Sequence, residues 1–331
     1  MRRSLLSIAL AVLPLGALAD SGAIVDAHVL PRFEVLAERS AELSDAAAAD
    51  CTASSAPLRA AYGAAFDAWI SASHLRFGPT EVADRGFALA FWPDSRGATP
   101  KALGRLIADE DEIAEDPEAY AQVSVAARGF YALEFLLYDD AFSAPGDYPC
   151  TLIQTVAADI AAVAAAIHTD WVEEYADRLR APAPEGTYRS EAEALQELFK
   201  ALTTGLQFTS ETRLGRPLGT FDRPRPARAE ARRSGRSAHH VALSLAALQD
   251  LAGRLASDDP ALAADLEEAF ARSMTLLAER DDPVFASVAA PQTRLKVEIL
   301  QQSVDEIRAV VSTDLGPRLG VASGFNSLDG D

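Results

Sequence analysis

The chain has 331 residues, and 49 acidic side chains against 30 Lys and Arg give it a formal net charge of −19 at pH 7. A surface this acidic repels phosphate backbones, so we expect no nucleic-acid partner. Single hydrophobic cores stop growing at roughly 250 to 300 residues, so a chain of this length indicates two cores.

The N-terminus has the pattern of a secretory signal peptide. Arg2 and Arg3 precede an apolar stretch that closes on the small residues Ala17 and Ala19. This stretch is short for a membrane span and no stop-transfer pattern follows it; an uncleaved anchor is the alternative. We therefore expect cleavage near Ala19/Asp20 and a soluble, periplasmic protein without stable membrane insertion.

The rest of the chain is predicted to be helical. Apolar residues recur at spacings of three and four, and no stretch alternates convincingly as a strand would. The fold class is therefore all-α. The spacing predicts helices over residues 24–49, 56–76, 82–90, 100–108, 117–138, 149–180, 188–214, 238–256, 260–280 and 291–313.

Two connections interrupt this helical pattern. The segment APAPEGT at 181–187 is the clearest linker signal in the chain. It divides the mature protein into an N-terminal helical bundle over 20–180 and a C-terminal one over 188–331, each long enough to form an antiparallel bundle. A second connection, at 215–237, is long, basic and rich in proline, which is uncommon in compact domains unless the segment is functional or disordered.

Cys51 and Cys150 are the only two cysteines. In an oxidising compartment a pair of this kind predicts one disulfide, whereas a metal or redox role would call for closer spacing or more ligands. Closing a loop of roughly 100 residues stabilises by about 4 to 5 kcal/mol in the chain-entropy model.

One carboxylate stands inside an apolar helical run. In RGFYALEFLLYDD, residues 128–140, Glu134 follows Tyr131 by three positions, so the two share a helix face. Gly129 lies about one turn earlier, where a missing side chain commonly marks a close contact between helices or access for a ligand. Burying an unpaired carboxylate costs several kcal/mol, so Glu134 is expected to have a ligand, an arginine partner between the bundles, or an exit to water.

A basic segment could supply that partner. ARRSGRSAHH, residues 231–240, places arginines at the start of a helix that Ser237 could cap. Arg233 and Arg236 could clamp an anionic ligand, or they could form a salt-bridge latch between the bundles.

The motif around Glu134 resembles the central motif of imelysin-like proteins, whose better-known branch carries Gly-x-His-x-x-Glu. Gly129 and Glu134 match that motif, and Tyr131 stands where the histidine would be. Further stretches resemble the branch that lacks the histidine, and the resemblance extends over nearly all of the mature chain. They are AWISASHLRFGP (68–79), FWPDSRG (91–97), CTLIQTVAADIAAVAAAIHTDW (150–171) and RRSGRS (232–237).

The resemblance implies two helical bundles with the Gly/Glu motif near their interface, a bacterial envelope location, an association with iron uptake or regulation, and a peptidase activity. A zinc peptidase needs three good protein ligands and a general base, commonly two histidines one helical turn apart with a glutamate between them. The histidines do not have this spacing, nor is there a Gly-x-Ser-x-Gly elbow. They are His28, His74, His168, His239 and His240.

Iron would suit the motif better than zinc, because a carboxylate and a phenolate are hard oxygen donors. Glu134 and Tyr131 could supply two ligands, with His74, Asp94 or His28 as additions from the same domain. The alternatives are that His74 is a core or interface histidine and that Asp94 caps a turn.

We therefore predict a non-catalytic binding or accessory protein in iron uptake, with iron or a small ligand and other envelope iron-uptake proteins as partners. Two other classes remain open: a metal-dependent peptidase, and a structural partner of another envelope protein. The predicted ligand site lies between the bundles and consists of Gly129, Tyr131, Glu134, Arg233, Arg236 and Ser237.

Overall fold

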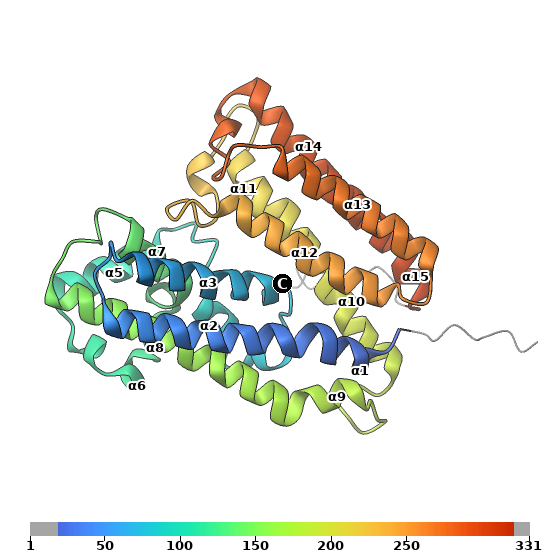
Figure 1. The fold of residues 1–331 in the computed structure, drawn as a ribbon, viewed down its shortest axis with the longest axis horizontal. Helices are drawn as coiled ribbons and strands as arrows, with labels where there is room; N and C mark the ends of the chain where they lie inside the picture. The colour runs from blue at the N-terminus through green and yellow to red at the C-terminus, as the bar shows by residue number, and fades with distance from the viewer. Residues whose placement is uncertain (1–18, 321–331) are drawn as a thin grey trace, which may run out of the picture.

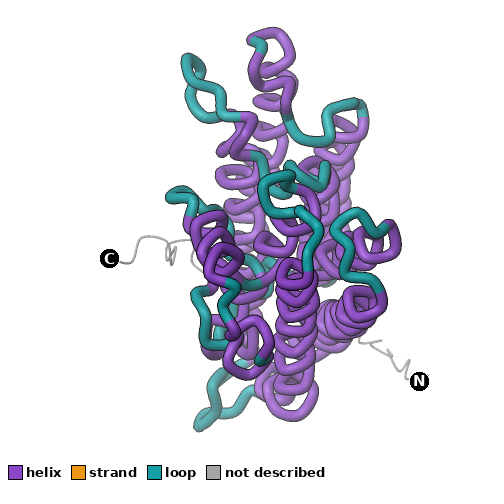
Figure 2. Tube along the Cα trace, turned by 90° about the vertical axis from the view of Figure 1, so that its left-hand side faces the viewer, coloured by secondary structure: helices purple, strands orange, loops and turns teal. Residues whose placement is uncertain are grey.

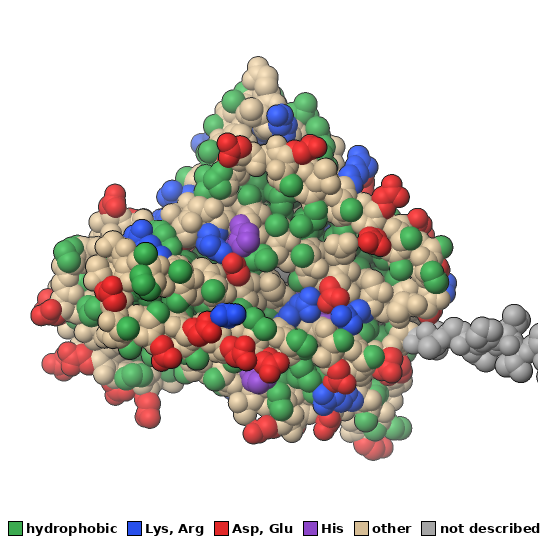
Figure 3. All heavy atoms as spheres, in the orientation of Figure 1, with side chains coloured by type: hydrophobic (Ala, Val, Ile, Leu, Met, Phe, Trp, Pro, Cys, Tyr) green, Lys and Arg blue, Asp and Glu red, His purple; other side chains and the backbone are tan. Residues whose placement is uncertain are grey.

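The structure is a computed structural model that describes residues 19–320, so the predicted leader up to residue 18 lies outside the described residues. Within that range the chain is built from helices and contains no β-strand, as Figures 1 and 2 show. The all-α fold class predicted from the sequence is confirmed. Acidic and basic side chains are interspersed over the face drawn in Figure 3.

The N-terminal half is organised around a long helix that runs through its middle. α2 (Leu30–Ala49) packs against α3 (Ala56–Ala72) on one side and α8 (Asp147–Asp170) on the other, and it runs antiparallel to both (Figure 1). Before α2, α1 (Ser21–Ile24) and the π-helical turn η1 (Val25–Val29) continue the same helix towards the N-terminus. Asp20, which would be the first mature residue, caps α1 by accepting a hydrogen bond from the backbone N–H of Ala23.

The predicted disulfide is present. Cys51 follows the C-terminal end of α2, and Cys150 lies in the first turn of α8. Their Cα atoms are 5.0 Å apart across a sequence separation of 99 residues. The bond therefore ties together two neighbouring helices of the N-terminal half.

Shorter elements complete this half, and α8 continues beyond Asp170. The apolar stretch from Asp147 to Arg180 is long enough to cross a membrane by length and composition, but half of its most apolar window is buried inside the protein. The remaining elements are η2 (Gly78–Thr80), η3 (Val82–Asp84), α4 (Arg85–Leu89), α5 (Ala98–Asp109), η4 (Glu112–Glu115), α6 (Pro117–Tyr120), η5 (Val125–Ala127), α7 (Gly129–Tyr138), η6 (Trp171–Tyr175) and α9 (Ala176–Arg180).

The C-terminal half contains four long helices. α12 (Ser237–Leu255) packs against α10 (Glu191–Gln207) and α13 (Pro260–Ala278), and α14 (Pro291–Val310) packs against α10 and α13. α12 also lies along α3, which brings the two halves into contact. Shorter elements extend α10 and α14 and interrupt the connections: η7 (Phe208–Leu214), α11 (Gly215–Leu218), η8 (Pro226–Arg228), η9 (Ala286–Ala289), η10 (Val311–Leu315) and α15 (Gly316–Arg318).

The helix predicted over 117–138 is wrong in one respect, because the structure breaks it into α6, η5 and α7. Gly129 is the first residue of α7 rather than an interior residue, and its φ of +74° lies in the left-handed region. A Cβ at Gly129 would lie 2.3 Å from the carbonyl oxygen of Ala88 and 2.2 Å from that of Leu89. The glycine thus lets the end of α4 touch the start of α7, which is the close helix contact that the sequence suggested.

We expect Gly129→Ala to lower the free energy of unfolding by about 3 kcal/mol or more, because strained backbone and backbone overlap add. The control is Gly253→Ala on α12, where φ is helical and a Cβ would meet nothing within 4 Å. That variant should gain up to about 1 kcal/mol from helix propensity. Urea unfolding followed by circular dichroism measures both, and equal stability of the two variants would contradict the packing argument.

Candidate functional site

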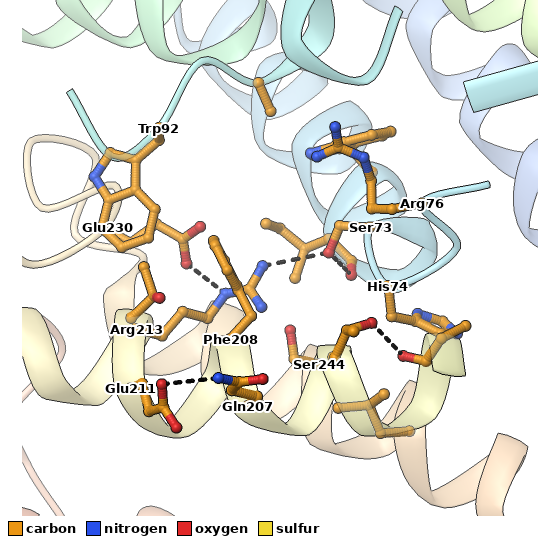
Figure 4. A pocket seen from close by; sticks show the side chains of 18 of the residues that line it. Ser73, His74, Arg76, Trp92, Gln207, Phe208, Glu211, Arg213, Glu230 and Ser244 are labelled. Atoms are coloured by element: carbon orange, nitrogen blue, oxygen red, sulfur yellow. Dashed lines mark hydrogen bonds and ion pairs between the residues drawn. The ribbon is translucent and has the colours of Figure 1, made fainter. Parts of the chain in front are cut away.

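A cavity of about 620 Å³ lies at the junction of the two halves. Its walls come from α3 and the 76–93 segment on one side and from α10, η7 and α12 on the other (Figure 4). The lining is mainly apolar and aromatic, with a small number of polar groups, which is the usual composition of a small-molecule site. Its large apolar side chains include Trp69, Phe77, Phe87, Trp92, Phe208 and Leu248.

Trp92 closes one end of this cavity. Its ring centroid lies 6.1 Å from that of Tyr131 and 5.9 Å from that of Phe208, so aromatic side chains of both halves meet there. Asp94 fixes the loop that carries Trp92 by accepting hydrogen bonds from the backbone N–H groups of Ala98 (2.9 Å) and Thr99 (2.8 Å). Asp94 therefore caps the turn before α5, which is the alternative to a metal ligand that the sequence left open.

A buried ion pair of the C-terminal half is hydrogen-bonded across the junction beside Trp92. The Glu230 carboxylate accepts a hydrogen bond from the Tyr131 hydroxyl at 2.5 Å and another from the Arg213 Nε at 2.8 Å. Arg213 also donates to the Ser73 hydroxyl at 3.3 Å, so its guanidinium lies between the halves (Figure 4). Tyr131, Arg213 and Glu230 are all at least 94% buried.

The electrostatics of this network define its protonation state. Burial alone would raise the pKa of Glu230, but Arg213, His240 and Tyr131 outweigh it and lower the pKa to about 2. Burial and the neighbouring Glu230 charge raise the pKa of Tyr131 well above its usual value. Glu230 is therefore ionised and Tyr131 is a neutral phenol that donates, so Tyr131 is not in the phenolate form that iron ligation would need.

His240 is fully buried next to the same carboxylate. Its Nδ1 lies 3.6 Å from Glu230 Oε2 and its Nε2 lies 4.0 Å from Asp67 Oδ1, and neither nitrogen has a hydrogen-bond partner among the described residues. Burial lowers the pKa of His240 despite the attraction of Glu230. The neighbouring His239 faces outward and contacts Asp67 Oδ2 at 3.0 Å. The two histidines thus differ in burial, but both approach the Asp67 carboxylate.

Glu134 is buried, with 2% of its surface exposed, and has a partner that the sequence did not predict. One oxygen, Oε1, accepts hydrogen bonds from the backbone N–H (2.9 Å) and the hydroxyl (2.8 Å) of Ser234. Burial raises the pKa of Glu134, and the Ser234 hydrogen bonds and nearby arginines oppose this shift. Glu134 is not among the residues that line the cavity.

The arginines on either side of Ser234 bind other carboxylates. Arg233 Nε lies 2.6 Å from Asp139 Oδ2, with the guanidinium carbon 3.6 Å from the centroid of the Phe135 ring, and Arg236 pairs with Asp67. In the structure both arginines therefore form the interdomain latch. The prediction that Ser237 caps α12 is wrong, because it is the first helical residue and its hydroxyl donates to the Glu230 carbonyl instead.

His28 and His74 form a second buried polar group at the other end of the junction. Their Nε2 atoms are 2.8 Å apart, and His28 Nδ1 lies 2.7 Å from Asp250 Oδ2. An ionised carboxylate only accepts, so Nδ1–H of His28 donates to Asp250 and Nε2 of His28 accepts from His74. Burial lowers the pKa of His28 to about 4 although Asp250 acts in the opposite direction. His74, which lines the cavity, is thus an interface histidine with a partner.

The four residues predicted to bind a metal are not brought together. Asp94 caps α5, His74 is bonded to His28, Tyr131 to Glu230 and Glu134 to Ser234. Over residues 19–320 no group of three or more His, Cys, Asp or Glu side chains is arranged to hold a metal ion. Of the six residues predicted to bind a small ligand, Tyr131 alone lines the cavity, whereas Glu134, Arg233 and Arg236 belong to the latch behind it.

Sequence reasoning missed the residues that build the junction. Arg213 and Phe208 lie in a helical stretch with no local motif, and Asp67 is one acidic residue among many. Only Glu230 carried a signal, because it is the single acidic residue in the otherwise basic stretch 223–236. A lone acid among six arginines is a candidate for a buried ion pair.

These features define an all-α protein of two packed helical halves, with a cavity at their junction and a buried Gly-x-Tyr-x-x-Glu segment beside it. The family model described as Imelysin, peptidase M75, matches residues 29–311, and the chain belongs to this family. The resemblance seen in the sequence is thereby confirmed. No curated protein has a significantly similar sequence.

Two solved structures share the fold. An imelysin-like protein from Psychrobacter arcticum 273-4 matches with a TM-score of 0.78 and 21% identity, over 92% of this chain and 96% of that one. A putative iron-regulated protein A precursor from Parabacteroides distasonis ATCC 8503 matches with a TM-score of 0.72 and 13% identity, over 88% of this chain and 93% of that one.

We expect Glu230→Gln to destabilise the protein by about 3 to 5 kcal/mol, because it leaves the buried Arg213 guanidinium without a counter-charge. The control is Glu306→Gln, which removes the exposed partner of Arg272 and should change the free energy of unfolding by less than about 1 kcal/mol. Urea unfolding of both variants tests this; a loss of the same size in each would show that Glu230 contributes no more than a surface pair.

Stability should fall as the pH falls from about 6.5 towards 4. The folded pKa of His28, about 4, lies below the 6.5 of the unfolded chain, so the unfolded state takes up the proton first. The stabilisation is complete above pH 6.5 and amounts to about 3 kcal/mol for this residue. Buried His74 and His240 act in the same direction, whereas the raised pKa of Glu134 acts in the opposite direction.

The measurement is urea unfolding at a series of pH values. His28→Gln should flatten the profile between pH 6.5 and 4. His168→Gln, on the half-buried side of α8, serves as the control and should keep the wild-type slope. An unchanged slope in His28→Gln would remove His28 from the pH dependence.

Proposed function

We propose that the protein is an exported, periplasmic binding or accessory protein of iron uptake that works without catalytic turnover and holds a small ligand in the cavity at the junction. The observation that carries the proposal is the cavity itself, which combines aromatic walls from both halves with cations that already have partners. Its cations are paired within the protein: Arg76 with Glu81, Lys200 with Glu197 and Arg213 with Glu230.

A small molecule fits this cavity better than a bare iron ion does. Direct iron binding at the motif would require Tyr131 to leave Glu230, and this separation would leave a buried group unsatisfied. An apolar ligand body needs no such rearrangement. The iron connection rests on the family and on the iron-regulated precursor that shares the fold.

Export rests on the leader pattern and on the disulfide, which requires an oxidising compartment. Asp20 supports it too, because it caps the first helix from the position that cleavage would make the new N-terminus. The peptidase associated with the family is the second candidate, and the experiment below includes an arm for it.

The test is growth of a deletion strain under iron limitation, complemented with wild-type protein or with Thr204→Trp. Thr204 lines the cavity, and an indole there would fill it. Thr203→Trp is the matched control, because Thr203 neighbours it on α10 without lining the cavity. We expect Thr203→Trp to restore growth and Thr204→Trp to fail.

Restored growth with both variants would contradict a role for the cavity. The purified mature protein is also incubated with unfolded casein, with and without added zinc or iron, and assayed for cleavage. We expect no cleavage; chelator-sensitive cleavage lost in Glu134→Ala would instead establish the peptidase.

A further inference from the structure

One guanidinium at the end of the cavity has no counter-charge. Arg216 is partly buried on α11, and its Nε is buried without a hydrogen-bond partner. Within residues 19–320 Arg216 makes neither an ion pair nor a side-chain hydrogen bond, in contrast to the paired cations Arg76, Lys200 and Arg213 that line the cavity. A buried donor of this kind keeps its desolvation penalty while it stays unsatisfied.

Arg216 is not one of the residues that line the cavity, but it contacts one of them, Trp92. Phe208 and Thr212 line the cavity, and Arg216 follows at the same spacing of four residues along the helical segment of η7 and α11. The guanidinium carbon of Arg216 lies 5.7 Å from the centroid of the Trp92 ring, the aromatic side chain that closes this end. Contact with a tryptophan holds a planar guanidinium in a fixed orientation and leaves its edge free to bind.

A second arginine lies on the element that packs against α11. Arg228 is an exposed residue of this element, η8, and it has no carboxylate partner among the described residues. Burial and the charge of Arg228 both lower the pKa of Arg216. Two neighbouring cations without an anion repel each other, and this arrangement is unusual in a chain with a net charge of −19. An oxyanion between them would relieve the repulsion and satisfy the orphaned Nε.

We propose that Arg216 and Arg228 bind an oxyanion group, a carboxylate or a phosphate, of a small molecule whose apolar body occupies the aromatic cavity. This assignment rests on the proposed ligand-binding function and narrows it to amphipathic anions. The apolar body contacts Trp92 and Phe208, and the anion lies just beyond Trp92. The arginine pair supplies charge and orientation, while the aromatic walls supply the buried area.

The test compares two fluorescent probes of the same skeleton, anilinonaphthalene sulfonate, which is an anion, and phenylnaphthylamine, which is neutral. Each is titrated into the folded mature protein, and the dissociation constant is read from the rise in fluorescence. We expect Arg216→Gln to weaken binding of the anionic probe about tenfold or more and to leave the neutral probe unchanged. Arg105→Gln, which removes an exposed charge on α5, should change neither.

Thr204→Trp separates this proposal from the proposed function, because it should abolish binding of both probes. If the neutral probe binds and is lost in Thr204→Trp, but Arg216→Gln leaves the anionic probe unaffected, the anion site is wrong and the cavity stands. If Thr204→Trp affects neither probe, the cavity is wrong as well.

Competition identifies the oxyanion. Naphthoate and naphthyl phosphate are each titrated against the bound sulfonate probe, and naphthalene methanol serves as the uncharged control. The proposal is supported if naphthoate or naphthyl phosphate displaces the probe from the wild-type protein and does so more weakly in Arg216→Gln. The stronger competitor of the two shows which group the site prefers. Displacement by the alcohol to the same extent as by the anions overturns it.

Discussion

The junction of the two helical halves depends on the hydrogen bonds that the buried Glu230 carboxylate accepts. Glu230 lies in the connection between α11 and α12 and accepts hydrogen bonds from Tyr131 on α7 and Arg213 on η7. An ionised carboxylate in the interior is tolerated only while its partners stay in place, because breaking such a pair costs about 3 to 5 kcal/mol. Glu230 therefore fixes the path of the connection relative to α7 and to η7, the element that extends α10.

The motif segment fastens the connection at two points rather than one. Tyr131 and Glu134 are one turn apart on α7 and bind Glu230 and Ser234, which lie 99 and 100 residues away in sequence. A neutral phenol suits position 131 because it donates to a carboxylate that stays ionised. The Gly129 backbone allows the start of α7 to approach α4 closely enough for this alignment. The motif of this branch thus acts as a structural clasp that places aromatic side chains around the cavity.

The clasp also sets the electrostatics of the cavity. Since Glu230 neutralises Arg213, and Glu81 and Glu197 neutralise Arg76 and Lys200, the interior presents aromatic surface with little net charge. Arg216, next to Trp92, is a cation without an anionic partner among the described residues. A ligand with one apolar and one anionic end would therefore enter in a single orientation, with its polar end directed along the helix that follows Phe208.

The sequence by itself determined the helices, the disulfide and the burial of Glu134, because each depends on local pattern or on composition: apolar spacing, a pair of cysteines, and one acid in an apolar run. It also determined the family, through motifs spread along the chain. Only the tertiary structure decided which groups meet. Glu230 and Tyr131 are brought together by a proline-rich connection whose path has no periodicity to predict from, and the pairing of Ser234 with Glu134 depends on that path. Long-range contacts of this kind follow from how the halves pack, which local spacing does not encode.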